Sequence, residues 1–171
     1  MFKIKLSILF LISISFIGCL ASRVSEKQFN VSSVANDSYF LYENTLVQYL
    51  DSMGMYNNTN YDYLIKINPS RSEGVFITNI DKNSDRKRIS LDINYTVAKR
   101  YNRTSLMCDV FTQNYKRSSS YIIASGEFNT SNRAADDEIF ENLVDIITND
   151  FIDDLGYFED KECRYKFVRE R

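Results

Sequence analysis

The segment Arg88–Ala98 alternates between apolar and polar side chains, and this alternation constrains the fold more than any other feature of the chain. Successive side chains of a β-strand point to opposite faces of its sheet, so one face of this strand is expected to be buried and the other solvated. The pattern predicts an antiparallel sheet that is covered on one face only. The apolar set is Ile89, Leu91, Ile93, Tyr95 and Val97, and the polar set is Ser90, Asp92, Asn94 and Thr96.

Three further segments carry strand patterns: residues 29–34, 61–68 and 104–114. Pro69 follows the second of them and has no N–H to donate to a neighbouring strand. That strand is therefore expected either to end at Pro69 or to bulge there and resume at residues 75–80. In the third segment, apolar residues occur on both faces, which makes its buried face less definite.

Short polar stretches connect these strands. Residues 81–85 and 99–103 suit the turns of β-hairpins, so the last strands are expected to form an antiparallel meander. Residues 121–125 either extend the sheet or belong to a loop.

Two segments have helical spacing. Residues 37–53 place apolar side chains three, four and seven positions apart, and Gly54 follows where a positive φ commonly ends a helix. Residues 131–155 begin with capping and acidic residues, end before Gly156, and carry an apolar stripe opposite an acidic face that is expected to be solvated. The two stripes are Phe40, Leu46, Val47, Leu50 and Met53, and Ile139, Leu143, Ile146, Ile147, Phe151 and Leu155.

The N-terminus has the pattern of a secretory signal. Lys3 and Lys5 precede an apolar run over residues 6–17 that is too short to span a bilayer, and Gly18 offers the small side chain that a signal peptidase requires. Cys19 follows directly, as in the lipobox of bacterial lipoproteins, so Cys19 is the predicted lipidation site. Several acyl chains on this cysteine would anchor the protein to a membrane almost permanently.

Two details bear on this interpretation. The alternative is an ordinary signal peptide cut near Ala21–Ser22, in which case Cys19 is lost with the signal. Leu20 occupies the position where an aspartate usually retains a lipoprotein in the inner membrane. Its identity therefore favours the outer membrane.

Composition excludes some classes of function. The 171-residue chain has a formal net charge of −2, and removal of Lys3 and Lys5 with residues 1–18 makes the remainder −4, so nucleic acid is not an expected partner. The chain contains no histidine, which is the residue most used for proton transfer near neutral pH and the commonest metal ligand. With no glycine-rich phosphate loop either, we expect no enzyme, no cofactor and no metal site.

Two cysteines remain after the signal. Cys108 and Cys163 would close a long loop, and a disulfide between them is allowed in an oxidising compartment, where it could contribute about 4 kcal/mol. The alternative for Cys108 is a buried thiol that packs as a small apolar side chain.

The order of these elements defines the expected fold class. It is α+β, β-α-β-β-β-α, with two helices on one face of a mostly antiparallel sheet of about four strands. The chain is expected to divide into a lipoprotein signal peptide, an acylated N-terminus with a linker, one α+β domain and a charged C-terminal tail. These parts are residues 1–18, 19–28, 29–156 and 157–171.

The same order resembles that of the lipopolysaccharide-assembly lipoprotein family, LptE. Three segments carry the resemblance: Tyr63–Ile65 after the first helix, the arginine-led strand Arg86–Val97, and Phe128–Ala135 leading into the last helix. The resemblance implies a protein at the periplasmic face of the outer membrane that plugs the lumen of the LptD β-barrel, assists its assembly and contacts lipopolysaccharide. The Gly-Phe that often follows the acylated cysteine in that family is absent here.

The predicted meander gives one independent indication of a binding surface. It would bring the turn after Ile80 and the segment after Asn114 to the same end of the sheet. Arginine and lysine suit the phosphates and acidic sugars of lipopolysaccharide. The alternative is a solvated hairpin end whose charges blunt the sheet edges. The basic set at this end is Lys82, Arg86, Lys87, Arg88, Lys116 and Arg117.

Two other functions remain open at this point. An auxiliary lipoprotein of a lipid ABC transporter would share the anchor and an α+β domain. A small secreted binding protein would lack acylation, and in a eukaryote it could carry glycans at Asn94 and Asn102.

Overall fold

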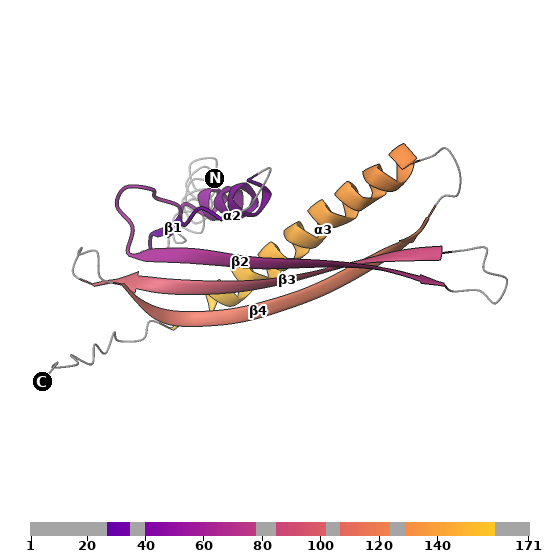
Figure 1. Cartoon of the computed structure of the whole chain (residues 1–171). Coiled ribbons are helices and arrows are strands. Elements are labelled where there is room, and N and C mark those ends of the chain that lie inside the picture. The colour runs from indigo at the N-terminus through magenta and orange to yellow at the C-terminus, as the bar shows by residue number, and fades with distance from the viewer. Residues whose placement is uncertain (1–26, 35–39, 78–84, 102–106, 124–128, 160–171) are drawn as a thin grey trace, which may run out of the picture.

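The computed structural model describes residues 27–34, 40–77, 85–101, 107–123 and 129–159. Its element order confirms the predicted α+β class (Figure 1). The elements are β1 (Phe29–Val31), α2 (Leu41–Ser52), β2 (Tyr63–Ile77), β3 (Asp85–Arg100), β4 (Met107–Ile122) and α3 (Asn129–Gly156).

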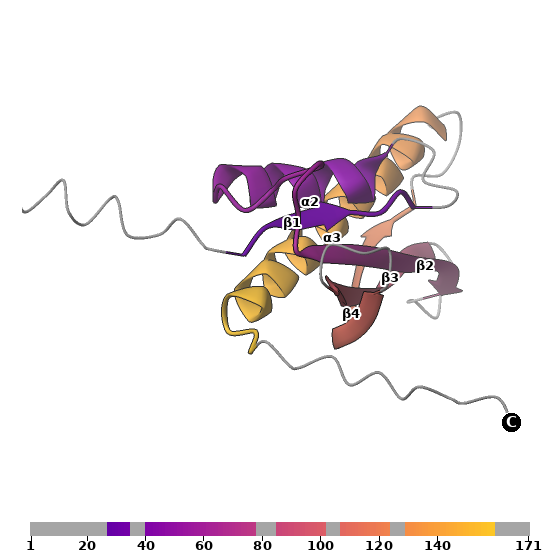
Figure 2. The ribbon, with the colours of Figure 1, turned by 90° about the vertical axis from the view of Figure 1, so that its left-hand side faces the viewer.

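The four strands form one sheet in the order β1-β2-β3-β4. β2, β3 and β4 are antiparallel to one another, whereas β1 runs parallel to β2, with Phe29 beside Tyr63 and Val31 beside Ile65. A parallel pair needs a crossover connection, and α2 supplies it. Both helices lie on the same face of the sheet, as predicted (Figure 2). We call this the inner face and the uncovered side the open face.

β2 continues through Pro69 instead of ending or bulging there. Pro69 pairs in register with Ile93 of β3. β1 pairs with the other edge of β2 only at residues 63–65, so no described strand pairs with that edge at Pro69. A proline nitrogen that faces an open edge removes no ladder hydrogen bond, which explains why the strand tolerates this residue.

β4 contains a bulge that accounts for its two partly apolar faces. The register with β3 shifts between Val97 and Ala98, whose partners are Phe111 and Asp109, so Val110 is an extra residue. Val110 is buried, and Phe111 packs against the core as well. β4 also extends to Ile122, so the serine-rich stretch after Arg117 belongs to the sheet.

The helices differ from prediction at three residues. Met53 of the first predicted stripe lies just after α2, which ends at Ser52, and is 40% exposed. Phe40 does not belong to the apolar stripe of α2: it precedes the helix in the left-handed region, with φ 53°, and is 61% exposed. Ile146 of α3 is 47% exposed because the buried side of the helix is centred on Val144, Ile147 and Phe151.

The core lies between the inner face and the helices. The five apolar residues predicted for β3, from Ile89 to Val97, are all fully buried. The core reaches Phe158, whose backbone carbonyl accepts a hydrogen bond from Lys27 Nζ at 2.9 Å. Within the described ranges, neither helix combines the length and apolar character needed to cross a membrane.

Candidate functional site

The basic residues predicted to gather at one end of the sheet lie on both of its faces. Val75–Phe76, Arg86–Arg88 and Tyr121–Ile122 are neighbours across β2, β3 and β4, and we call this region the distal tip. Side chains alternate between the faces along each strand. Lys87 shares the parity of the buried residue Ile89 and therefore lies on the inner face, whereas Arg86 and Arg88 lie on the open face.

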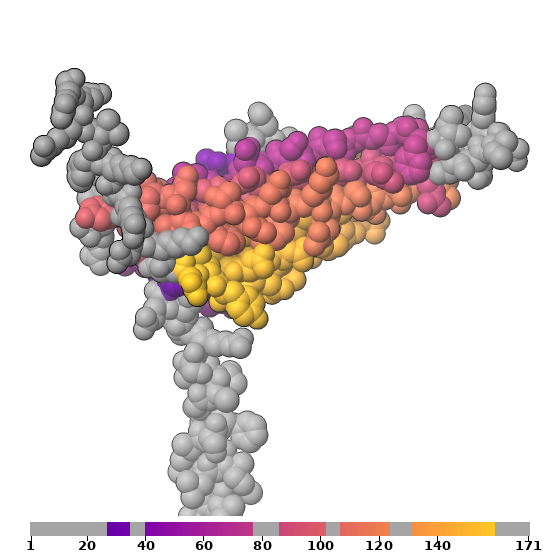
Figure 3. Space-filling model, turned by 90° about the horizontal axis from the view of Figure 1, so that it is seen from below, coloured from indigo at the N-terminus to yellow at the C-terminus, as the bar shows by residue number. Residues whose placement is uncertain are grey.

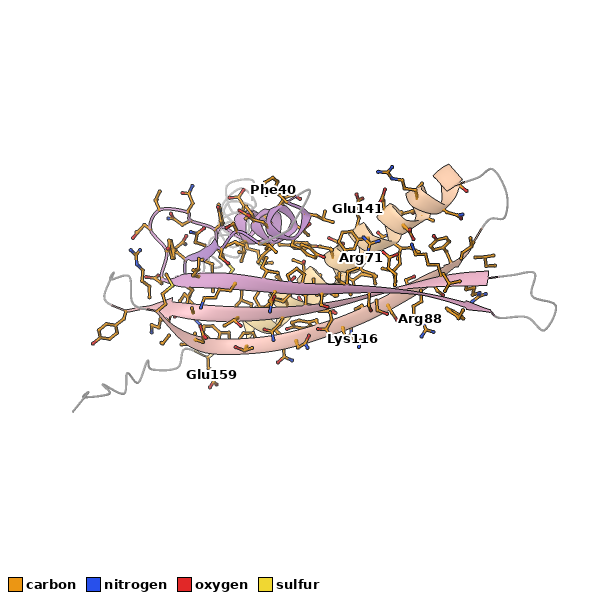
Figure 4. The ribbon with its side chains drawn as sticks, in the orientation of Figure 1. Phe40, Arg71, Arg88, Lys116, Glu141 and Glu159 are labelled. Carbon is orange, nitrogen blue, oxygen red and sulfur yellow. The ribbon has the colours of Figure 1, made fainter. Side chains whose placement is uncertain are left out.

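Lys116 and Arg117 are displaced from the tip and separated by the same alternation. Their partners in β3 are Asp92 and Leu91, several residues nearer the centre of the strand. Figure 4 shows Arg88 and Lys116 on the open face, while Arg71 points toward α3. Three of the six predicted residues, Arg86, Arg88 and Lys116, thus share one face.

The open face of the distal tip combines guanidinium groups with apolar side chains. Phe76, Arg86 and Ile122 form one row across the three strands. The guanidinium of Arg88 lies 5.1 Å from the centre of the Phe76 ring, a cation–π contact. Ile122 is 59% exposed. This surface can contact an anionic group and an apolar group of the same ligand.

The inner face of the distal tip is an ion-pair cluster. Lys87 Nζ lies 2.6 Å from a carboxylate oxygen of Glu73 and 2.5 Å from one of Asp136 in α3. Arg71 pairs with Glu73 at 2.6 Å, and its guanidinium lies 4.5 Å from the centre of the Phe140 ring. Lys87 therefore links β2 and β3 to the first turns of α3, and its charge is used in holding the fold together.

The pKa values in this cluster favour the charged forms. Burial alone would lower the pKa of Lys87, but hydrogen bonds to Asp136 and Glu73 outweigh it and raise that pKa. The hydrogen bond from Lys87 lowers the pKa of Glu73. Burial alone would raise the pKa of Asp136, but hydrogen bonds from Lys87 and Tyr121 outweigh it and lower that pKa. The cluster therefore holds its charges at neutral pH.

Arg117 is also engaged by α3. Its guanidinium donates to a carboxylate oxygen of Asp150 at 2.6 Å, and two residues earlier the Tyr115 hydroxyl donates to Asp154 at 2.5 Å. Burial, with the hydrogen bond to Asp154, raises the pKa of Tyr115, so this phenol stays protonated. Arg117 and Lys87 are thus fold-stabilising residues rather than free cations for a ligand.

Three predicted site residues, Lys82, Cys19 and Cys163, lie outside the described residues. Cys108 is disulfide-bonded and partly buried beside the core. Since its predicted partner Cys163 is outside the described part of the chain, that pairing stays a prediction.

Phe76 and Ile122 were not among the residues predicted for this site. Their position depends on the register of the β2–β3 and β3–β4 pairs, which brings both beside Arg86. The alternation of β3 could have predicted which of its basic residues lie on each face of the sheet. It places Lys87 on the face of Ile89 and the two arginines on the other face.

The arrangement is suited to binding. Guanidinium groups form paired hydrogen bonds with phosphate and carboxylate groups, and the adjacent apolar side chains can cover hydrocarbon. Within the described ranges, no group of acidic and cysteine side chains is placed to hold a metal ion.

Comparison with solved structures identifies bacterial lipoproteins with this fold. A minor lipoprotein from Acinetobacter baumannii superposes with a TM-score of 0.57 at 14% sequence identity, covering 78% of this chain and 92% of that chain. Rare lipoprotein B from Shewanella oneidensis superposes with a TM-score of 0.58 at 10% sequence identity, covering 77% of this chain and 95% of that chain. A proposed lipoprotein from Caulobacter crescentus superposes with a TM-score of 0.51 at 14% sequence identity, covering 75% of this chain and 88% of that chain.

These similarities are structural. No protein-family model matches the chain, and no curated protein matches its sequence significantly. At such low identities, the comparison shows a shared fold that extends over most of each molecule.

Proposed function

We propose that this protein is an outer-membrane lipoprotein that plugs an LptD-type β-barrel, assists its assembly and thereby serves lipopolysaccharide transport. The observation that carries the proposal is the fold, which three bacterial lipoproteins share over at least 75% of this chain. The lipobox-like sequence before Cys19 supports an anchor at the N-terminus. The role requires no catalytic residue.

The open face is compatible with a barrel lumen. Side chains on this face include exposed serine, asparagine and threonine residues from β2 and β4, and the interiors of outer-membrane barrels are polar. A plug must satisfy that polar wall while keeping its own hydrophobic core on the other side of the sheet. A two-layer domain with one uncovered polar face meets both requirements. Examples on this face are Asn68, Ser70, Ser72, Thr112, Asn114, Ser118 and Ser120.

The first test identifies the anchor and the partner together. The full-length tagged protein is isolated from envelopes in mild detergent, and its partners and N-terminal peptide are analysed by mass spectrometry, with Cys19→Ala as the control. Acylated Cys19 with a large outer-membrane barrel would support the proposal. Acylated Cys19 with an ATPase complex would favour an auxiliary role in lipid transport instead. An N-terminus cut near Ala21–Ser22 without acylation would overturn the lipoprotein assignment.

Within this role, we propose that Arg86 and Arg88, with Phe76 and Ile122, contact lipopolysaccharide directly. Both arginines are exposed, and among the described residues neither forms a salt bridge. Lys116 extends the same face toward the centre of the sheet, and Lys82 belongs to the predicted set. The ion-paired residues Lys87 and Arg117 are not assigned to this contact.

The arginine contact has a matched control on the same face. The pair Arg86→Glu and Arg88→Glu should weaken lipopolysaccharide binding about tenfold or more, because each loses a charge-assisted contact. Lys66→Glu reverses a charge on the open face near Asp109, far from the tip, and should leave affinity within about twofold. Binding is measured with purified lipopolysaccharide by surface plasmon resonance. Equal losses in both variants would indicate a general charge effect and contradict this assignment.

A further inference from the structure

β4 presents an open strand edge. It is the last strand of the sheet, and over residues 109–122 no backbone hydrogen bond joins it to any described residue outside β3. One carbonyl, that of Lys116, accepts a side-chain bond from Arg117 at 3.2 Å. β4 contains neither proline nor glycine, whereas the opposite side of the sheet has β1, Pro69 and Gly74. The bulge at Val110 and the charged side chains Lys116 and Arg117 give β4 part of the protection typical of natural edges, but the N–H and C=O groups of an edge strand can still accept another strand.

α3 extends beyond this edge, and its exposed residues are mostly acidic or Asn but include the apolar Ile146, with Tyr157 directly after the helix. Figure 3 shows the yellow atoms of α3 projecting past those of β4. Asp150 bonds Arg117 and thus marks the side of the helix beside β4. Ile146 lies one turn earlier on the same side and is 47% exposed, and Tyr157, directly after the helix, is 88% exposed. These side chains have apolar surface in water, and the edge beside them pairs with no described strand other than β3.

A cavity lies between the C-terminal end of α3 and the edge of β4. Its volume is about 340 Å³, and its lining is mostly apolar or aromatic with two carboxylates: Val110, Phe111 and Gln113 of β4, Asp154 of α3, and Tyr157, Phe158 and Glu159 after the helix. An incoming strand would direct alternate side chains into this space. In strand addition, main-chain hydrogen bonds supply affinity and pockets for alternate side chains supply specificity.

We propose that the β4 edge is a docking site for a single extended strand of a partner protein. Alternate apolar side chains of that strand face Ile146, Tyr157 and the cavity, and its other side chains are polar and continue the open face. A carboxylate fits opposite Lys116, which forms no ion pair with any described residue. Apart from Lys116, which the two surfaces share, this edge is distinct from the arginine contact at the distal tip, so the proposal goes beyond the proposed function.

The overhang of α3 favours a lone strand over a second copy of this chain. In a continuous sheet built from two β4 strands, each copy would bring its own α3 to the same side of the shared edge. The two helices would then compete for the space that the overhang already fills (Figure 3). A single strand has no second layer and avoids this conflict.

The test uses the full-length protein and the synthetic peptide Ser-Leu-Thr-Phe-Asp-Leu-Thr-Val-Ser, which alternates polar and apolar residues and carries one carboxylate. A peptide of the same composition with its apolar residues in one block is the control. We expect the alternating peptide to protect backbone amides of residues 109–118 from hydrogen exchange, and the control peptide to leave them unprotected. No protection at millimolar peptide, or equal protection by both peptides, would overturn the proposal.

Three surface variants locate the docked strand. Ile146→Asn and Tyr157→Ser should each weaken peptide binding about tenfold, the loss expected when a side chain of this size no longer buries apolar area. Val75→Asn removes an apolar side chain at the far end of β2 whose exposure, 62%, lies between those of Ile146 and Tyr157, and it should change affinity less than about twofold. Circular dichroism should be unchanged in all three. A loss of affinity in Val75→Asn alone, or β4 protection accompanied by a dimer in light scattering without peptide, would contradict the docking of a lone strand.

Discussion

The two halves of the sheet are joined to α3 by different interactions. In the proximal half, near β1 and the C-terminal end of α3, the contacts are aromatic: Tyr95 stacks on Phe151 at 4.1 Å, and Phe111 and Tyr115 lie against the same ring. In the distal half, Lys87 bridges Glu73 and Asp136 instead. The same helix is thus fixed mainly by aromatic burial at its C-terminal end, with added bonds from Asp150 and Asp154, and by an ion-pair cluster at its N-terminal end.

This difference follows from what the neighbouring strands offer. β3 is apolar on its inner face from Ile89 to Val97, but its distal neighbours in β2 and β4 are Arg71, Glu73 and Arg117. Their long side chains cover apolar surface and place charges at its border, where α3 supplies the partners. Apolar contacts respond little to pH, whereas ion pairs depend on it. We therefore expect the stability of the distal half to depend more on pH than that of the proximal half.

The largest expected loss of stability comes from a substitution in the proximal half. Phe151 is fully buried, so Phe151→Ala should lower the free energy of unfolding by about 3–5 kcal/mol. Phe140 is the distal comparison: it is only partly buried and touches Tyr42 and Arg71, and Phe140→Ala should cost about 1–2 kcal/mol. Urea denaturation measures both. Equal losses would show that the halves contribute alike.

A smaller effect is expected from the distal ion pair. Lys87→Met and Asp136→Asn should each lower the free energy of unfolding by about 1–2 kcal/mol, because each leaves a partly buried charge without its partner. The double variant should cost less than the sum by about 1 kcal/mol. The same denaturation experiment completes this double-mutant cycle. Strict additivity would mean that the two side chains do not interact in solution.

The smallest expected effect is a selective response to acid. The folded-state pKa values of Asp136 and Glu73 are lowered, so their contribution is present above the ordinary carboxyl pKa near 4 and is lost as pH falls through the folded values. The loss at Asp136 should be about 1 kcal/mol or less. Hydrogen exchange should show the distal half opening first. Asp136→Asn should reduce this acid response, and an identical response in both halves would contradict the comparison.

Alkaline pH provides a contrast in the proximal half. Burial raises the pKa of Tyr95 to about 12, and its hydroxyl lies 3.2 Å from that of Thr148. The unfolded chain would ionise this phenol near its ordinary pKa of about 10, so the associated stability is lost only as pH rises from there toward the folded value.

Several features of the fold could be predicted because they depend on local patterns. The period-two alternation of β3 identified its buried residues, and the helical spacing of α3 identified Leu143, Ile147, Phe151 and Leu155 as core. Pro69 was ambiguous since its tolerance depends on the short length of β1, a separate segment. Phe40 fitted the spacing of α2, but its left-handed backbone excludes it from the helix.

The candidate site was only partly predictable. Grouping basic residues by their position along the chain placed six of them together, although alternation separates Arg86 and Arg88 from Lys87. Asp136 and Asp150, which engage Lys87 and Arg117, belong to α3 and lie far along the sequence. No local pattern identifies such partners, because they depend on how the helix crosses the sheet.

By itself, the sequence determined the class of fold, the buried face of β3 and the presence of cations near one end of the sheet. These properties follow from side-chain periodicity and turn chemistry, which act over a few residues. Only the tertiary structure decided which cations are bound by α3, which remain on the open face with Phe76 and Ile122, and that α3 overhangs the outer edge of β4, where no described strand pairs. Those outcomes depend on strand register and helix placement, which are set by packing between segments distant in the chain.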